Sequence, residues 1–175
     1  MIRSRAALSV DAATGEVLFS KNSNSRLAPA STTKLMTAIV AVENEDLSRV
    51  VTISRKAART APTRAGLREG DQLSLESLLY AALLKSANDA AVAIAETVSG
   101  SEERFVALMN QKAVTIGAEN TRFINATGLP GEGQHTTAMD LSKILNYALG
   151  NPKLREIIGT PEARIATVKG RVFHL

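Results

Sequence analysis

The chain contains no cysteine and no tryptophan, and aromatic residues make up only 3% of its 175 residues. The lack of cysteine excludes thiolate catalysis and cysteine-based metal sites. With so few aromatic side chains, the core must be packed mainly by Ala, Leu, Val and Ile, which suits close-packed helices. His135 and His174 are the only histidines, and neither has a second ligand at metal-binding spacing. The sequence therefore predicts no metal and no cofactor.

Long apolar runs are also missing. None approaches the ~20 residues that a membrane-spanning helix needs. The first five residues are basic, but the stretch behind them alternates and carries Asp11 where a signal peptide has its apolar segment. The formal net charge is a modest +4, and the Lys and Arg residues are scattered rather than gathered with aromatics. Nucleic-acid binding is therefore not expected.

The hydrophobic pattern predicts a hairpin at each end and a helical middle. Strands are expected at 5–10 and 16–20, near 50–54, and at 164–168 and 171–175. Helices are expected from Ser31 through Val42, from Ser74 to Leu84, and at 90–98, 102–116, 138–149 and from Pro152. This order predicts a single α+β domain over residues 1–175, in which the terminal strands share one antiparallel sheet.

Ser31 and Lys34 stand at the start of the first apolar helix. One interpretation is a simple N-cap, but a capping box has Glu or Gln where this chain has lysine. A lysine there also faces the positive end of the helix dipole, at a cost of about 0.3–1 kcal/mol. Because positions i and i+3 share a face, the amine can reach the hydroxyl, and burial would lower its pKa toward that of a base. Both interpretations remain open on this spacing alone.

Ser86 and Asn88 lie between two apolar helical runs. They are interpreted either as a helix junction, with Asn88 or Asp89 as the cap, or as part of a site. Buried polar groups need partners, and the flanking residues suggest an interior position. A serine–lysine site needs a hydroxyl to relay a proton and an amide to hold the substrate backbone. The combination of Ser86 and Asn88 with Ser31 and Lys34 indicates a serine–lysine site more specifically than either pair does alone.

Residues 29–38, Pro-Ala-Ser-Thr-Thr-Lys-Leu-Met-Thr-Ala, resemble the active-site helix of the low-molecular-mass penicillin-binding proteins, the serine D-Ala-D-Ala carboxypeptidases. Residues 85–91 resemble their S-x-N segment, and the resemblance continues at 11–15, 67–71, 125–130 and 135–138. It covers essentially the whole chain, with specific motifs. It implies a serine β-lactamase/penicillin-binding-protein-like fold, with a helical core and an antiparallel sheet formed by the terminal strands.

The resemblance also implies roles. Ser31 would be acylated by the penultimate D-Ala carbonyl, with Lys34 as its base and the Ser31 N–H as one oxyanion donor. Ser86, hydrogen-bonded to Lys34, would relay a proton, and Asn88 would hold the substrate peptide. Water would then release the acyl group. β-Lactams, which are similar to the D-Ala-D-Ala terminus, should acylate the same serine and leave slowly.

The family's third motif, K-T-G, does not occur in these 175 residues. Lys169-Gly170 is too short for it, and the stretch at 135–137 has no glycine. We therefore expect a domain truncated before its last strands, with an incomplete sheet. Loss of one oxyanion donor costs on the order of 10²–10³ in rate elsewhere, so weak activity of this chain alone is expected. A second chain or a swapped dimer is one way to supply the missing strands.

Other functions stay open beside the carboxypeptidase. A D,D-endopeptidase would differ only in cleft shape. A class A β-lactamase would have S-D-N, whereas position 87 is alanine. A non-catalytic remnant that binds peptidoglycan or a partner is favoured by the missing K-T-G and opposed by the retained Lys34. The resemblance implies a periplasmic or cell-surface location with the export signal removed, and a partner that is a stem peptide ending in D-Ala-D-Ala.

Overall fold

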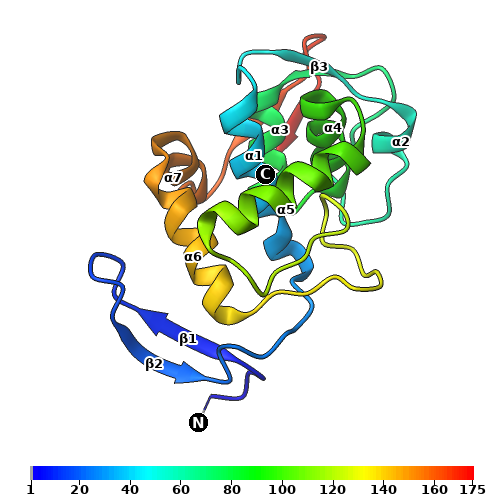
Figure 1. Cartoon of the computed structure of the whole chain (residues 1–175). Coiled ribbons are helices and arrows are strands. Elements are labelled where there is room, and N and C mark those ends of the chain that lie inside the picture. The colour runs from blue at the N-terminus through cyan, green and yellow to red at the C-terminus, as the bar shows by residue number, and fades with distance from the viewer. Residues whose placement is uncertain (1) are drawn as a thin grey trace.

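The computed structural model describes residues 2–175, which form a helical body flanked by three two-stranded antiparallel sheets (Figure 1). The strands are β1 (Ala7–Val10), β2 (Val17–Lys21), β3 (Val50–Thr52), β4 (Gln72–Ser74), β5 (Arg164–Ala166) and β6 (Val172–His174). After a 3₁₀ turn, η1 (Ala30–Thr32), the helices are α1 (Thr33–Asn44), α2 (Arg55–Ala58), α3 (Leu75–Leu84), α4 (Asn88–Ser99), α5 (Glu102–Ile116), α6 (Ala138–Gly150) and α7 (Pro152–Ile158).

Helix α1 lies at the centre of the core and packs against α3, α4, α5 and α6. Every residue from Met36 to Ala41 is buried, as expected for a helix that is apolar on nearly every side. Helix α4 is buried in the same way from Asn88 to Ala95, where five of the eight residues are alanine or valine. Such small side chains let neighbouring helices approach closely, which compensates for the scarcity of aromatics.

Several helices begin or end at residues that commonly cap helices. Ser74 accepts a hydrogen bond from the N–H of Ser77 at the start of α3, and Thr137 accepts one from Asp140 at the start of α6. Gly100 and Gly117, both with positive φ, close α4 and α5. The expected helices are confirmed to within about two residues at each end.

The mixed α+β class is confirmed, but residues 2–175 do not form a sheet shared by the two terminal hairpins. β1 pairs only with β2, and β5 only with β6, while β3 and β4 form the third sheet. The strand β1 lies against α6, whereas β5 lies against α3. Figure 1 shows the first hairpin at the bottom and the last, in red, at the top. Strand periodicity reveals which residues pair locally but not which strand lies beside the pair.

None of the helices in residues 2–175 combines the length and the apolar character that crossing a bilayer needs. The same residues contain no group of three His, Asp or Glu side chains placed to hold a metal ion.

Candidate active site

The turn η1 presents Ser31 at the surface directly before α1 begins. Lys34 lies in the first turn of α1 and is only 2% exposed. Between Pro29 and Ser31, Ala30 adopts a φ of +48°, a left-handed conformation that is uncommon for residues other than glycine. The chain therefore enters α1 through a constrained bend that leaves the hydroxyl outside and places the amine inside.

The segment 125–129 packs directly onto this bend. Gly128 has a φ of +84°, and a Cβ built on it would lie 1.8 Å from the carbonyl oxygen of Ala30. Only glycine fits such a close approach. Asn125 shapes the segment from within, because its Oδ1 accepts hydrogen bonds from the N–H groups of Thr127 and Gly128. The residue before the candidate nucleophile is thus held by a loop that lies almost a hundred residues later in the chain.

The same loop binds the buried amine. Lys34 Nζ donates a hydrogen bond to the carbonyl oxygen of Thr127 at 2.6 Å, and Thr37, one turn further along, donates to the carbonyl of Ala126 at 2.7 Å. No carboxylate in residues 2–175 forms an ion pair with Lys34. Burial without a compensating anion lowers the pKa of Lys34 to about 8. This amine can therefore lose its proton near neutral pH.

The second motif lies at the junction of α3 and α4. Ser86 is half-buried and has a φ of +55°. Asn88 is 4% exposed, and its Nδ2 donates to the carbonyl of Ala61 while its N–H donates to that of Thr63. Within residues 2–175 no hydrogen bond reaches the Oδ1 of Asn88. One N–H of the Asn88 amide is engaged by the protein, and its Oδ1 is available to accept from a peptide N–H.

Asp89 has a role that the sequence interpretation missed. The N-cap position of α4 is Ala87, so neither Asn88 nor Asp89 caps the helix as expected. Asp89 is fully buried, and its carboxylate accepts hydrogen bonds from the N–H groups of three successive residues, Ala65, Gly66 and Leu67, at 2.9–3.0 Å. It anchors the loop before β4 to the start of α4. An acidic residue in an otherwise apolar helical run was the available signal.

Helix α1, which carries Lys34, packs against α4, which begins at Asn88. The hydrogen bond expected between Lys34 and Ser86 is not formed in residues 2–175, where the amine donates to the carbonyl of Thr127. Ser31 and Ser86 likewise lack side-chain hydrogen bonds within the described chain. Both hydroxyls are thus free to bond to a ligand.

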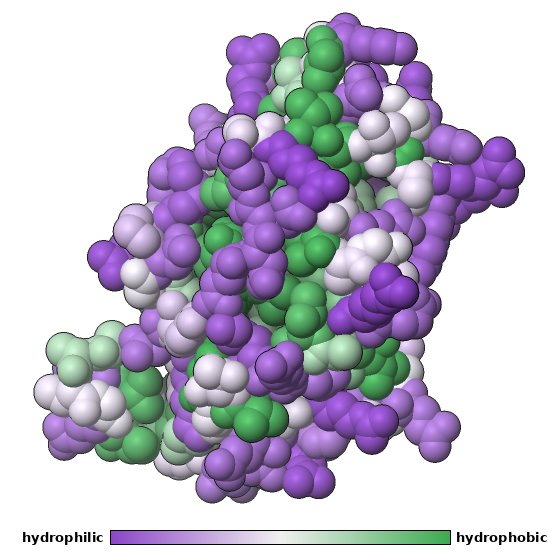
Figure 2. Space-filling model, turned by 45° about the horizontal axis from the view of Figure 1, so that its top comes forward, coloured by the Kyte–Doolittle hydropathy of each residue, from purple (hydrophilic) through white to green (hydrophobic). Residues whose placement is uncertain are grey.

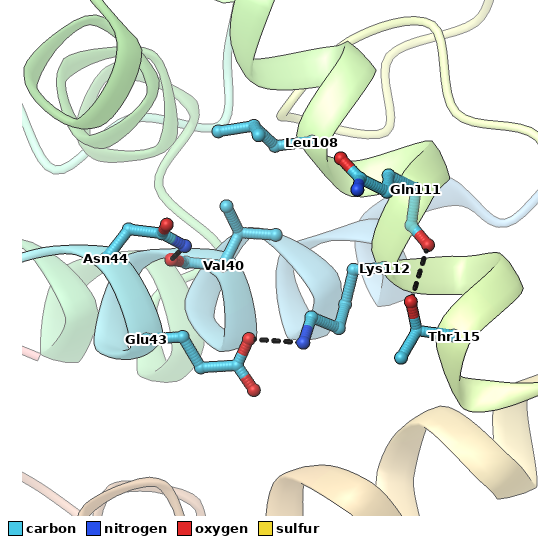
Figure 3. A pocket seen from close by; sticks show the side chains of 7 residues that line it. All are labelled: Val40, Glu43, Asn44, Leu108, Gln111, Lys112 and Thr115. Atoms are coloured by element: carbon cyan, nitrogen blue, oxygen red, sulfur yellow. Dashed lines mark hydrogen bonds and ion pairs between the residues drawn. The ribbon is translucent and has the colours of Figure 1, made fainter.

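A different hollow, of about 230 Å³, opens between α1 and α5 near the other end of α1 (Figure 3). There Glu43 forms an ion pair with Lys112 at 2.6 Å and accepts a hydrogen bond from the Tyr147 hydroxyl at 2.6 Å. The hydrogen bond with Glu43 raises the pKa of Lys112. These contacts join α1, α5 and α6, and the polar groups satisfy one another.

The chain matches the model of the Peptidase_S11 family, D-alanyl-D-alanine carboxypeptidase, over residues 1–173. It is 38% identical to the D-alanyl-D-alanine carboxypeptidase DacF of Bacillus subtilis over 98% of this chain and 45% of that protein. It is 36% identical to a D-alanyl-D-alanine endopeptidase of Pseudomonas aeruginosa over 94% of this chain and 54% of that protein.

Among solved structures, the D-alanyl-D-alanine carboxypeptidase DacD from Francisella tularensis superposes with a TM-score of 0.87 at 36% identity, covering 90% of this chain and 40% of that one. The chain therefore spans about half the length, or less, of these relatives.

Proposed function

Since the chain belongs to the Peptidase_S11 family of D-alanyl-D-alanine carboxypeptidases, we propose that it is a serine-type D-Ala-D-Ala carboxypeptidase acting on peptidoglycan stem peptides. One observation carries the proposal: the exposed Ser31 stands one turn before a buried Lys34 whose pKa is lowered to about 8. A serine hydroxyl is a weak nucleophile unless a base takes its proton, and this amine is such a base.

In the proposed reaction, Ser31 Oγ attacks the carbonyl carbon of the penultimate D-Ala while neutral Lys34 takes the hydroxyl proton. The N–H of Ser31, near the start of α1, donates to the oxyanion that forms. The C–N bond then breaks, and the departing amine of the terminal D-Ala receives a proton through Ser86. Water finally hydrolyses the ester on Ser31, which restores the free hydroxyl.

Asn88 is proposed to hold the substrate backbone. Its Nδ2 is bound to the carbonyl of Ala61 at 3.0 Å, so the orientation of the amide is set before a ligand arrives. The free Oδ1 then accepts a hydrogen bond from a substrate N–H. Asp89 supports this arrangement, because its carboxylate fixes the loop that also carries Ala61. A preset acceptor avoids the entropic cost of ordering a side chain on binding.

A second candidate is the D,D-endopeptidase, favoured by the relative of that name at 36% identity. Both reactions acylate the same serine, and they differ in the amine that leaves. Peptides with a free D-Ala leaving group and peptides with a cross-linked one distinguish them. Either substrate lies outside the cytoplasmic membrane, so we place the protein there.

The first test is covalent labelling by a fluorescent penicillin, read by intact mass. We expect one adduct per chain, lost in Ser31→Ala and kept in Ser25→Ala, a change at an exposed serine outside the site. An adduct that survives Ser31→Ala, or none with the unmodified chain, would overturn the proposed nucleophile. Because no K-T-G sequence occurs in residues 1–175, we expect this chain alone to release D-Ala slowly.

A further inference from the structure

A hollow of about 430 Å³ lies beside the candidate active site, bounded by α4, the loop 125–129 and the residues around the end of α2. Its walls include the apolar side chains of Val92 and Leu129 and the polar ones of Thr127 and Arg59. The mixture of apolar walls with few polar groups is typical of small-ligand sites.

The hollow adjoins the proposed chemistry at two points. Thr127, which lines it, is the residue whose carbonyl oxygen accepts the hydrogen bond from Lys34. Val92 lies four residues after Asn88 on α4, so the two side chains are neighbours on one helix face, about 6 Å apart. A peptide held by Asn88 would therefore lie next to Val92, on one wall of this hollow.

The charged side chains around the hollow are paired with one another, apart from Arg59. Lys56 lies 3.0 Å from Glu102 and 3.9 Å from Glu103. The other oxygen of Glu102 accepts a hydrogen bond from the N–H of Ala126. Arg59 is exposed, and its guanidinium forms no hydrogen bond or ion pair within residues 2–175. The five N–H donors of this guanidinium are thus available to a ligand at this wall.

We infer that this hollow is a subsite for a carboxylate-bearing residue of the peptide that Ser31 attacks, with Arg59 as the carboxylate ligand. The inference rests on the proposed function, since the peptide is the substrate assumed there. Arginine binds carboxylates through two parallel N–H donors, a geometry that a neutral side chain does not match. Val92 and Leu129 accept the methylene part of such a side chain.

The test is equilibrium binding of two synthetic peptides to the Ser31→Ala chain, which cannot be acylated there. Both end in D-Ala-D-Ala, and they differ only in having Glu or Gln before it. We expect the Glu peptide to bind about twofold to fivefold more tightly at low salt, with the preference falling as salt rises. Arg59→Gln should abolish the preference. Arg68→Gln, at an exposed arginine that does not line the hollow, should keep it.

Equal binding of the two peptides, a preference that survives Arg59→Gln, or no binding of either peptide would each overturn the subsite. Penicillin labelling of Ser31 reports the proposed catalysis separately. Labelling without a peptide preference removes the subsite alone. A preference that depends on Arg59, in a chain that penicillin never labels, supports the subsite and removes the proposed catalysis.

Discussion

The burial of Lys34 determines the pH range in which the proposed base is neutral. The folded chain lowers the pKa of this amine from 10.5 to about 8, and desolvation is the cause. Between these two values the unfolded chain holds the proton that the folded chain has released. The free energy of unfolding therefore gains a contribution that increases as the pH rises from about 8 to 10.5.

We predict that the rate of Ser31 acylation by penicillin rises with pH and levels off above about 8. At pH 7 the rate should be about tenfold below the plateau, because most Lys34 side chains then carry the proton. Rapid-mixing measurements of adduct formation between pH 6 and 10 check this. Lys34→Met, which keeps the length and removes the amine, should abolish both the acylation and the pH-dependent part of stability. A rate that does not change over this range would rule out Lys34 as the base.

Sequence reasoning could propose Ser31, Lys34, Ser86 and Asn88 as site residues because each belongs to a short local motif. Its alternative of Asn88 or Asp89 as a helix cap was wrong, and it missed the role of Asp89 because the N–H groups that this carboxylate binds lie more than twenty residues earlier in the chain. It likewise gave no sign that Thr127 receives the hydrogen bond of Lys34. Contacts between segments far apart in the chain produce no regular spacing in the sequence, so a search for sequence patterns does not detect them.

At the scale of elements, the loop 125–129 determines how η1 meets α1. We predict that Gly128→Ala lowers the free energy of unfolding by more than about 3 kcal/mol, because the new methyl group would overlap the Ala30 carbonyl. Gly133→Ala is the matched control: its φ of +80° is nearly the same, but the nearest atoms to a new Cβ are 3.8 Å away. It should cost about 1–2 kcal/mol, from backbone strain alone.

Urea unfolding of both variants gives the comparison, and penicillin labelling shows whether Ser31 remains in place. Similar losses of stability would mean that the close contact with Ala30 relaxes easily. In that case the loop would not constrain the bend before Ser31.

Element ends were predictable where a cap is local. The side chains of Ser74, Ser101 and Thr137 each accept a hydrogen bond from the N–H three residues later. The capping residue and the helix start that it marks therefore lie within the same four residues of sequence. The start of α4 was placed two residues late because Ala87, a residue without a capping side chain, precedes it. Which helix or strand lies beside each hairpin depends on the packing of the whole chain, and local hydrophobic periodicity carries no information on that packing.

At the scale of the whole molecule, Figure 2 shows hydrophilic residues interspersed with groups of hydrophobic ones on the face in view. Strand β2 carries a run of exposed apolar residues. Val17, Leu18 and Phe19 are consecutive and exposed, and β1 covers only one edge of the strand. Exposed apolar strands at a sheet edge favour pairing with another strand.

We predict that two copies of the chain pair antiparallel through β2. Pairing centred between Leu18 and Phe19 would place Glu16 of each copy opposite Lys21 of the other, a favourable cross-strand pair. Sedimentation at increasing concentration should show a dimer that Leu18→Lys disrupts. Val114→Lys, at a more exposed apolar residue on α5, should leave it intact. A monomer at every concentration, or equal effects of the two variants, would contradict pairing through this edge.

The separation of the three sheets has a consequence for the order in which the chain acquires its structure. Each sheet joins strands that follow one another along the chain, so pairing within a sheet needs no strand from the other end of the chain. The residues proposed for catalysis and for the subsite all lie between Pro29 and Leu129, ahead of β5 and β6. The site and the last hairpin therefore share no residue, and the pairing of β5 with β6 is not a precondition for the contacts that position Ser31 and Lys34.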